Sequence, residues 1–314
     1  MTTSPIPAVQ TTTEQPGFRV EPIEYQSGLA DLRVVRETVF VHEQNVPIEE
    51  EWDALDPQCV HVIARDNIGT PIGTGRLTPE RKIGRMAVLR DWRNKGVGDA
   101  LLLALIAQAQ QLGWREVALN SQVDAQRFYA RHGFLPHGER FREAGIDHQP
   151  MRRKLSGASA IEHREAAIAI VTAIITQARR HLCIYSRDLD PGLFDAPDII
   201  DALRRFGTNG RGSEVHVVLQ DADAPQRALA PLIGLGQRLP SVFAFREVID
   251  PVDRAYASAF VVNDGGGYYF RTLGHRFDGE SALDGAGRAR QLHEGFDRVW
   301  ERSRPVTEYR ALGL

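Results

Sequence analysis

The chain has 314 residues, of which 42% are hydrophobic and 25% are charged. This length suggests about two domains, and the composition excludes a collagenous, fibrous or wholly disordered protein. The 38 basic and 41 acidic residues give a net charge of -3, so the overall charge does not favour nucleic acid as a partner. Cys59 and Cys183 are too few for a disulfide framework or a zinc pattern, which fits a reducing cytosol.

Residues 1–16 are rich in Thr, Ser, Pro and Gln and have neither a basic start nor an apolar core. They do not resemble a secretory signal, and we expect a disordered tail. The most apolar run, residues 166–175, is much shorter than the ~20 residues that a membrane-spanning helix needs. We therefore expect a soluble, cytoplasmic protein with no membrane partner.

The first half alternates short strands with helices. Turn chemistry at Asp66–Gly69 and Thr78–Glu80 separates extended segments and indicates an antiparallel meander. We predict strands at 18–25, 60–65, 71–77, 82–88, 117–121, 135–141 and 149–155, and helices at 29–42 (capped by Ser27), 98–112 (ended by Gly113) and 125–131. The layout is α/β (α+β), with a mixed, mostly antiparallel sheet.

A small-residue stretch, Ser156–Ser159, has the composition of a linker, and a second βα pattern follows it. We therefore expect two domains, at residues 17–156 and 157–314, the second an α/β accessory domain. Its predicted strands are 182–186, 214–219, 242–248, 259–262 and 268–271, and its predicted helices are 160–180, 199–206, 226–239 and 288–303.

The most informative motif is Arg93-Asn94-Lys95-Gly96-Val97-Gly98, between a predicted strand and a predicted helix. Two glycines allow a close approach of the backbone to an anion, and the helix start presents free N–H groups and a positive dipole end. These are the properties of a pyrophosphate site. A tight turn with solvated basic residues is the alternative. The motif lacks the third glycine of a Rossmann fingerprint and the Gly-Lys-Ser/Thr of a P-loop.

This motif resembles the Arg/Gln-x-x-Gly-x-Gly/Ala signature of the GNAT N-acetyltransferase superfamily. Further segments in family order support the resemblance over about residues 18–155, including 84–88, 119–122 and 125–134. Residues 39–44 and 145–151 are similar to the ElaA-like branch. The resemblance implies a GNAT acyl-CoA N-acyltransferase fold and acetyl-CoA as co-substrate, without a metal.

The resemblance also implies roles for individual residues. A tyrosine at the position of Tyr129 often protonates the departing CoA thiolate, and a phenol is chemically suited to do so. Packing of a short helix is the alternative for Tyr129 and Phe128, and we favour it for Phe128, although we include Phe128 among the cofactor-binding residues. The resemblance implies that the backbone of Met86, Ala87 and Val88 pairs with the pantetheine arm. It implies that Asn120 lies near the cofactor and that the pyrophosphate is bound by Arg93, Lys95, Gly96, Val97 and Gly98.

An amine acceptor must lose a proton, which a carboxylate or histidine can accept. Glu43, Asp53 and His148 fall on positions that match the ElaA-like branch, and we predict that they act on the acceptor side. The acidic residues from Glu43 to Asp56 are either a solvated loop or a pocket that attracts cations. Arg36 and Arg76 are suited to an acceptor carboxylate, with exposed salt bridges as the default.

The second half weakly resembles one half of a phospholipase D-like domain. That family uses His-x-Lys-x4-Asp, whereas the best-matching segment here is Tyr256-x-Ser258-x4-Asn263, and residues 157–314 contain no lysine. We therefore predict a degenerate domain without phosphodiesterase activity. Asp188, Asp190 and Asp195 are predicted in turns and caps, with metal binding as the alternative.

Together these features predict an enzyme that moves an acetyl group from acetyl-CoA to the amine of a small molecule or protein. The alternative is a protein that senses acyl-CoA and whose second domain recognises a partner or a phosphate-bearing ligand. Nucleic acid is an unfavoured partner, and the oligomeric state is not predicted. A weaker hypothesis, a phosphate- or nucleic-acid-binding second half, rests on arginines such as Arg179, Arg180, Arg204, Arg205 and Arg211.

Overall fold

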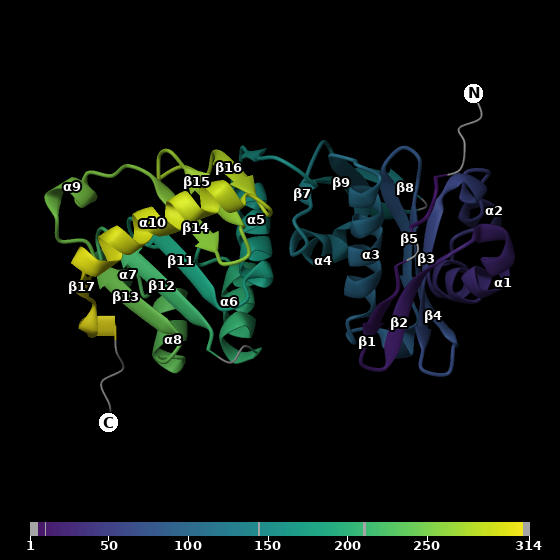
Figure 1. Ribbon diagram of the computed structural model, residues 1–314, viewed down its shortest axis with the longest axis horizontal. Coiled ribbons are helices and arrows are strands. Elements are labelled where there is room, and N and C mark those ends of the chain that lie inside the picture. The colour runs from purple at the N-terminus through teal and green to yellow at the C-terminus, as the bar shows by residue number, and fades with distance from the viewer. Residues whose placement is uncertain (1–5, 10, 144, 210–211, 310–314) are drawn as a thin grey trace. The chain divides into compact units, whose positions relative to one another are not determined.

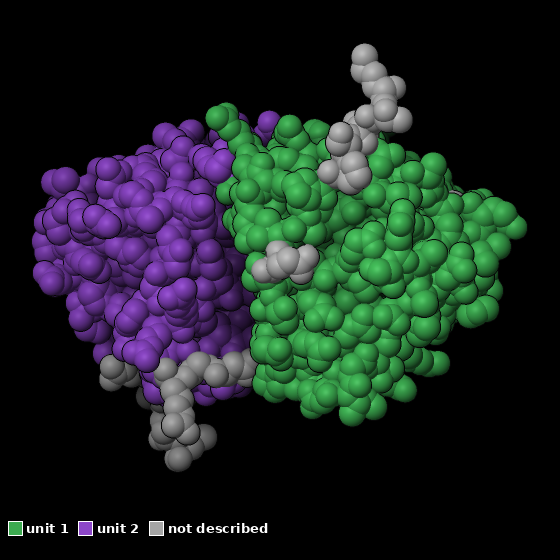
Figure 2. Space-filling view, turned by 45° about the vertical axis from the view of Figure 1, so that its right-hand side comes forward, with its two compact units in different colours: residues 1–122, 137–155 green, residues 123–136, 156–314 purple. Residues whose placement is uncertain are grey.

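The computed structural model describes residues 6–9, 11–143, 145–209 and 212–309 (Figure 1). Contacts within the chain divide it into two compact units, shown in different colours in Figure 2. The first comprises residues 1–122 and 137–155, and the second comprises 123–136 and 156–314. In the described part of the chain, no helix combines the length and apolarity needed to cross a membrane.

The first unit is built on a mixed, mostly antiparallel sheet, as predicted. Neighbouring strands follow the order β1-β2-β3-β4-β5-β6-β9, with β8 beside β9, and among these pairs of described strands only β5 and β6 run parallel. The strands are β1 Thr13–Gln15, β2 Phe18–Ile23, β3 Val60–Asp66, β4 Pro71–Leu77, β5 Lys82–Val88, β6 Glu116–Gln122, β8 Phe141–Glu143 and β9 Ile146–Lys154.

The helical elements of the first unit connect these strands. The longest, α3, begins within the motif Arg93–Gly98 and ends before Gly113, which takes the left-handed conformation at φ 71°. The elements are α1 Tyr25–Arg36, the π-helix η1 Glu37–Glu43, α2 Ile48–Glu51, η2 Asp56–Gln58, η3 Arg90–Trp92 and α3 Val97–Gln111.

Helices α3 and α1 pack on opposite faces of the first sheet. On one face a Cβ added to Gly73 would lie 2.9 Å from Leu101, and one added to Gly75 would lie 2.8 Å from Leu105. Glycine at these two positions is what allows α3 to lie so close to β4. On the other face, buried apolar residues of α1, η1 and β5 pack together: Val35, Val39 and Ala87.

Two expectations for the start of the chain were wrong. Glu24 rather than Ser27 caps α1, because its carboxylate accepts hydrogen bonds from the N–H groups of Gln26 and Ser27. Residues 1–16 were expected to be a disordered tail, but Thr13–Gln15 pairs with β2 and the backbone of Val9 exchanges two hydrogen bonds with the Gln108 side chain. Residues 1–5 and 10 lie outside the described residues.

The second unit has a sheet with strand order β10-β16-β15-β14-β11-β12-β13-β17. Strands β11, β12 and β13 are parallel to one another, and the remaining neighbours are antiparallel. The strands are β10 Ser159–Ile161, β11 His181–Ser186, β12 Glu214–Leu219, β13 Phe243–Glu247, β14 Ala259–Asn263, β15 Tyr268–Arg271, β16 Gly279–Ala282 and β17 Arg304–Pro305.

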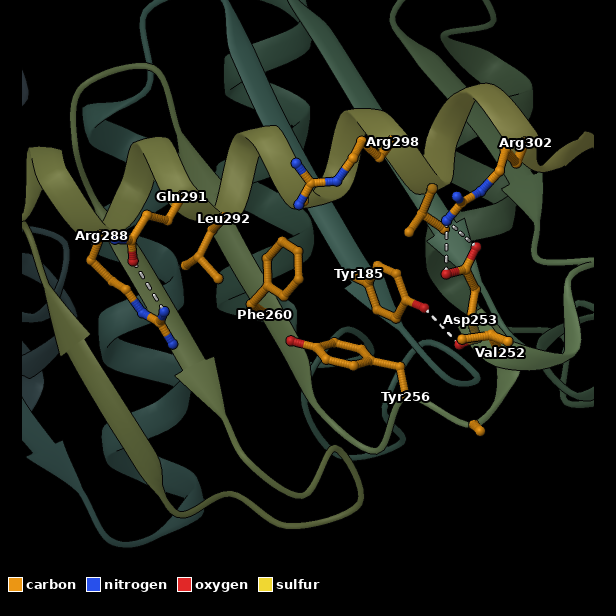
Figure 3. A pocket seen from close by; sticks show the side chains of 13 residues that line it. Tyr185, Val252, Asp253, Tyr256, Phe260, Arg288, Gln291, Leu292, Arg298 and Arg302 are labelled. Atoms are coloured by element: carbon orange, nitrogen blue, oxygen red, sulfur yellow. Dashed lines mark hydrogen bonds and ion pairs between the residues drawn. The ribbon is translucent and has the colours of Figure 1, made fainter.

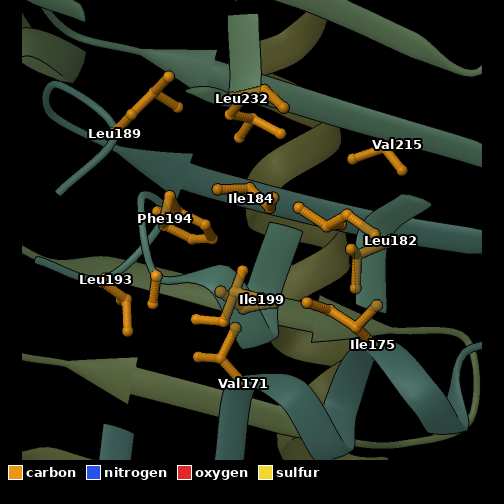
Figure 4. Packing of buried hydrophobic residues seen from close by; sticks show 14 of the residues in the cluster. Val171, Ile175, Leu182, Ile184, Leu189, Leu193, Phe194, Ile199, Val215 and Leu232 are labelled. Carbon is orange, nitrogen blue, oxygen red and sulfur yellow. The ribbon is translucent and has the colours of Figure 1, made fainter. Parts of the chain in front are cut away.

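Helices cover both faces of this second sheet, as expected for a sheet with a parallel centre. Leu182 and Ile184 of β11 face a core that α5, α6 and α8 share (Figure 4), whereas Cys183 and Tyr185 face α10. The helical elements are η4 Val123–Ala125, α4 Gln126–Ala130, α5 Arg164–Gln177, α6 Pro197–Asn209, α7 Asp223–Arg227, α8 Pro231–Arg238, α9 Pro251–Arg254, α10 Ala286–Arg302 and η5 Thr307–Tyr309, and this unit also contains β7 Leu135–Pro136.

Two predicted helices of this unit are interrupted. The helix expected over 226–239 is the pair α7 and α8, because Pro231 cannot continue a helix and disfavours a helical residue before it. The helix expected from residue 160 begins at Arg164, since Ser159–Ile161 pairs with β16 instead.

Candidate functional site

The loop before α3 offers backbone N–H groups to an anion. Asn94 and Gly96 both have left-handed backbone conformations, at φ 62° and 82°, and α3 begins at Val97. No side chain caps this helix, so its first N–H groups keep their hydrogen-bonding capacity. Alternating left-handed residues next to a helix start form a concave set of N–H donors, and the helix dipole adds positive potential.

Two basic side chains accompany these N–H groups. The Nη2 atom of Arg93 donates to Oε2 of Glu43 at 2.5 Å, and its Nε atom donates to the carbonyl oxygen of Val88 at 3.0 Å. The Lys95 ammonium lies 5.1 Å from the centre of the Trp92 ring. Arg93 is therefore engaged on two sides, whereas the exposed Lys95 forms no ion pair with the described residues.

The strand that leads to the loop has an open edge. β5 and β6 pair only at Lys82–Ala118 and Ile83–Leu119, whereas β6 stays paired with β9 as far as Gln122–His148. From Gly84 onward the two parallel strands separate. Met86, Ala87 and Val88 consequently have no strand partner on the β6 side among the described residues, although the Val88 carbonyl oxygen accepts the hydrogen bond from Arg93. The exposed Asn120 lies in the separated part of β6.

A β-bulge lies in the same part of β5. Thr74 pairs with Ala87 and Arg76 with Gly84, so two residues, Arg85 and Met86, face the single residue between Thr74 and Arg76. Arg85 has φ 49°, which is unusual for a residue with a side chain. Such strained positions in strands often occur at functional sites, since a bulge redirects both side chains and backbone groups.

A buried network of charges holds the acidic segment in place. Arg36 donates to Oε1 of Glu51 at 2.5 Å and to both carboxylate oxygens of Asp56 at 3.0 and 3.2 Å. Arg76 donates to Asp56 at 2.7 Å. Arg36 and Asp56 are 0% exposed and Glu51 is 1% exposed. These residues therefore form neither the solvated loop nor the exposed salt bridges that the sequence analysis considered. Removing one member of such a pair typically costs about 3–5 kcal/mol of stability.

The pKa values in this network follow from burial and from the arginines. Burial favours a higher pKa for Asp56, but the hydrogen bonds and charges of Arg36 and Arg76 outweigh it and lower the pKa. At Glu51 burial prevails and raises the pKa despite Arg36 and Arg85. Burial lowers the pKa of His61, whose Nε2 donates to the carbonyl oxygen of Asp56 at 2.8 Å.

Two of the three predicted acceptor-side residues are engaged by arginines. Glu43 is bound by Arg93, and Arg76 donates to the carboxylate of Asp53 at 2.9 and 3.0 Å. The third, His148, lies on β9 opposite Gln122. Its Nδ1 lies 3.0 Å from the carbonyl oxygen of Ile146, which can only accept, so this bond places the proton on Nδ1 and leaves the Nε2 lone pair available.

Tyr129 and Phe128 lie on α4, which belongs to the second unit. The Tyr129 ring packs edge-on against Phe128 and Phe134, with centroids 4.9 and 6.0 Å away. Burial raises the pKa of Tyr129 to about 12. Its hydroxyl therefore stays protonated in the physiological pH range, as a proton donor must.

The described residues contain no group of His, Cys, Asp and Glu side chains that could hold a metal ion. Asp190, one of the aspartates considered in this respect, is buried and pairs with Arg271. Of the arginines noted in the second half, Arg211 lies outside the described residues.

The sequence did not predict that Glu51, Asp56 and Arg85 belong to one ionic network with Arg36 and Arg76. A signal was present, because Arg36 shares a helix with the apolar residues that face the core.

Comparisons with known proteins agree with this geometry in the first half. The sequence model of the acetyltransferase (GNAT) domain matches residues 28–155. The uncharacterized N-acetyltransferase YjcF of Bacillus subtilis is 40% identical over 129 residues, which cover 40% of this chain and 91% of that protein. The UPF0039 protein C11D3.02c of Schizosaccharomyces pombe is 34% identical over 133 residues, which cover 40% of this chain and 88% of that protein.

Solved structures give related matches. An acyl-CoA N-acyltransferase from Pseudomonas aeruginosa is 30% identical, with a TM-score of 0.40, and the match covers 43% of this chain and 99% of that one. ElaA of Escherichia coli is 27% identical, with a TM-score of 0.39 and the same coverage. The second half, residues 163–312, matches a domain of unknown function, DUF7931. Through residues 28–155 the chain belongs to the GNAT acetyltransferase family.

Proposed function

We propose that the protein transfers the acetyl group of acetyl-CoA to an amine of a small molecule or a protein. The observation that carries this proposal is the uncapped start of α3, with its left-handed Asn94 and Gly96, directly after the separated strand β5. An anion and an extended chain are the two parts that such an arrangement accommodates, and acetyl-CoA has both. When bound, it supplies the acetyl thioester.

The residues predicted from the sequence fit this ligand. The N–H groups of Lys95, Gly96, Val97 and Gly98 would bind the pyrophosphate, with the Lys95 ammonium adding charge. Met86, Ala87 and Val88 would pair with the pantetheine arm through the backbone edge that β6 leaves unpaired, where the Val88 carbonyl already accepts from Arg93. Arg93 would add positive charge to the pyrophosphate site, and its ion pair with Glu43 offsets part of that charge. Asn120 would line the gap between the strands, and the cofactor-side role of Phe128 stays a prediction.

His148 is the general base that we favour among the three acceptor-side candidates. Its Nδ1 is directed to the Ile146 carbonyl, which leaves Nε2 to accept a proton from the amine. The carboxylates of Glu43 and Asp53 already accept charged hydrogen bonds from Arg93 and Arg76, so a further proton on either would break an ion pair. We assign Glu43 to offsetting the charge of Arg93 and Asp53 to holding the acidic segment.

Tyr129 is the proposed donor to the departing sulfur. A phenol with a pKa of about 12 is a weaker acid than an ordinary thiol, whose pKa is about 8.5, so complete proton transfer to the thiolate is uphill. The hydroxyl would therefore act mainly by donating a hydrogen bond to the sulfur as its negative charge develops.

For the second unit we propose no catalytic activity. Its likeness to a degenerate phospholipase D-like domain and the domain bounds 17–156 and 157–314 stay predictions. Tyr256 and Ser258, at the positions of the missing histidine and lysine, provide neither an activated nucleophile nor a cation for a phosphoryl group. We therefore maintain that this unit does not hydrolyse phosphodiesters.

The test is the release of CoA from acetyl-CoA by the full chain across a panel of amines, including polyamines, amino acids, aminoglycosides and peptides with free N-termini or lysines. Amine-dependent CoA release, with an acetylated product of the expected mass, supports the proposal. If acetyl-CoA binds but no amine accelerates its breakdown, the protein is an acyl-CoA sensor rather than an enzyme.

A further inference from the structure

The second unit contains a pocket of about 540 Å³ on the α10 face of its sheet (Figure 3). This volume lies within the range of about 300–1,000 Å³ that is typical of small-molecule sites. The wall is one stripe of α10, whose members recur every three or four residues and so share a face of the helix. That stripe consists of Arg288, Gln291, Leu292, Gly295, Arg298, Val299 and Arg302.

Arg298 is the cation of this stripe that the protein leaves uncompensated. Arg302 donates to both oxygens of Asp253 at 2.8 and 3.0 Å, and Arg288 lies 3.6 Å from Glu280. Among the residues that the structure describes, no carboxylate lies within ion-pair distance of Arg298. Figure 3 shows Arg298 between the other two arginines along α10. A planar guanidinium with free N–H groups is suited to a phosphate or carboxylate.

The wall opposite α10 contains three aromatic residues, of which Tyr185 and Phe260 are buried, at 2% and 3% exposed, and Tyr256 is the exposed one. Tyr185 and Phe260 stack with centroids 5.4 Å apart, and Tyr256 packs edge-on against Tyr185 at 5.4 Å. Tyr256 is 42% exposed, so part of its ring is free for a ligand. Its backbone is fixed, because its carbonyl oxygen accepts from Gln220 at 2.6 Å. An aromatic ring held in this way is a preformed surface for stacking.

Gly295 leaves the pocket wall without a side chain at its centre. A glycine within a helix costs about 0.5–1 kcal/mol relative to alanine. A Cβ at Gly295 would meet only the tip of Arg298, at 4.0 Å, so no neighbouring part of the protein requires the missing side chain. The residue lies in the pocket wall, one turn before Arg298, where the absence of a side chain keeps the pocket open.

We propose that this pocket binds a mononucleotide, with the phosphate on Arg298 and the base between Gly295 and the Tyr256 ring. The charge, the aromatic wall and the volume each match one part of such a ligand. A nucleic acid strand fits less well, because the chain as a whole carries a net charge of -3 and offers no extended basic field. The arginines noted in the sequence, such as Arg204, do not line the pocket.

The experiment is isothermal titration calorimetry of the full chain with the four nucleoside 5′-monophosphates, adenosine, ribose 5-phosphate and inorganic phosphate. We expect saturable binding of at least one nucleoside monophosphate with a Kd below about 1 mM. The nucleoside and the sugar phosphate should bind at least tenfold more weakly. Equal binding of ribose 5-phosphate, or no binding of any monophosphate, would overturn the proposal.

Variants then locate the site. Arg298→Gln should weaken binding by roughly 10- to 100-fold, as expected for lost hydrogen bonds to a charged group. Arg290→Gln, an exposed arginine of α10 outside the pocket wall, is the matched control and should change nothing. Gly295→Leu should abolish binding while the thermal midpoint stays the same or rises, since leucine favours a helix.

Two outcomes would change the assigned site or the assigned ligand. Binding that survives Arg298→Gln and Gly295→Leu but is lost in a Gly96 variant lies at the loop of the first unit, and the pocket proposal is then wrong. A single-stranded oligonucleotide that binds much more tightly than any mononucleotide, with the same dependence on Arg298, would replace the small ligand with a nucleic acid.

Discussion

Arg93 and Glu43 form an ion pair of 2.5 Å between residues 50 positions apart in the sequence. Glu43 ends the π-helix after α1, and Arg93 begins the loop that precedes α3. Both side chains are partly exposed, at 41% for Arg93 and 32% for Glu43. The pair joins a residue implied on the acceptor side to a residue implied in the pyrophosphate site, which makes the role of Glu43 testable by its effect on cofactor affinity.

Glu43→Gln should tighten the binding of acetyl-CoA by up to about fivefold, because it frees Arg93 and removes a negative charge near an anionic ligand; an exposed ion pair is worth at most about 1 kcal/mol. The kcat should change by less than about threefold. Calorimetry with acetyl-CoA and steady-state kinetics measure the two quantities. Glu49→Gln, an exposed residue of the same acidic segment, is the control. A large loss of kcat at unchanged affinity would instead make Glu43 the general base.

Tyr129→Phe should lower kcat and leave the affinity for acetyl-CoA nearly unchanged. The ring, which packs against Phe128 and Phe134, is retained, and only the hydroxyl is lost. The expected loss lies toward the lower end of the ~10²–10⁴-fold range of general acid catalysis, because hydrogen bonding replaces full proton transfer. A wild-type rate would assign protonation to water, and a large loss of affinity would make the hydroxyl a binding contact.

His148→Asn should reduce kcat by about 10²-fold or more if the imidazole accepts the proton of the amine. The KM for acetyl-CoA should stay within about threefold, because the proposed base would act on the acceptor rather than on the cofactor. Asp147→Asn serves as the control, since Asp147 precedes His148 and its side chain is 69% exposed. Equal kcat values for His148→Asn and Asp147→Asn would remove His148 from the mechanism.

The stability of the first unit should fall as the pH is lowered below about 6.5. The pKa of His61 is lowered in the folded state from 6.5, so the unfolded chain binds the proton first and acid favours unfolding. The slope from this residue is at most about 1.4 kcal/mol per pH unit. It begins near pH 6.5 and ends at the folded-state pKa.

Scanning calorimetry between pH 7.5 and 5.5 measures this effect on the transition that acetyl-CoA shifts, which identifies the first unit. His61→Gln keeps a donor for the carbonyl of Asp56 and should flatten the pH dependence. The same slope in both proteins would assign the acid sensitivity to other groups.

Local patterns predicted most of the strands and helices of the first unit. The loop at Arg93–Gly98 was found because its chemistry is contiguous: glycines, basic residues and a helix start follow one another in the chain. The turn residues between β3, β4 and β5 likewise fixed the meander, and Gly113 ended α3 where expected.

Features that depend on distant residues were not predicted. Arg36 lies 15 positions before Glu51 and 20 before Asp56. These groups come together, and become buried, only when the chain folds. The separation of β5 from β6 after two residue pairs is equally a property of the sheet. Where a predicted helix differs from the observed one, two local signals conflict. At Pro231, for example, the proline interrupts the helix that the apolar pattern predicted.

The most direct test of the central claim is the affinity of acetyl-CoA for the wild type, Gly96→Leu and Gly113→Leu, measured by calorimetry and by thermal shift. Both glycines are left-handed, at φ 82° and 71°, and both have open space around a built Cβ, so the substitutions carry similar backbone strain at opposite ends of α3. Acetyl-CoA at ~100 times its Kd should stabilise the wild type and Gly113→Leu by about 2.7 kcal/mol. Gly96→Leu should lose most of this stabilisation, whereas equal protection of all three proteins would contradict the assignment of the loop as the acetyl-CoA site.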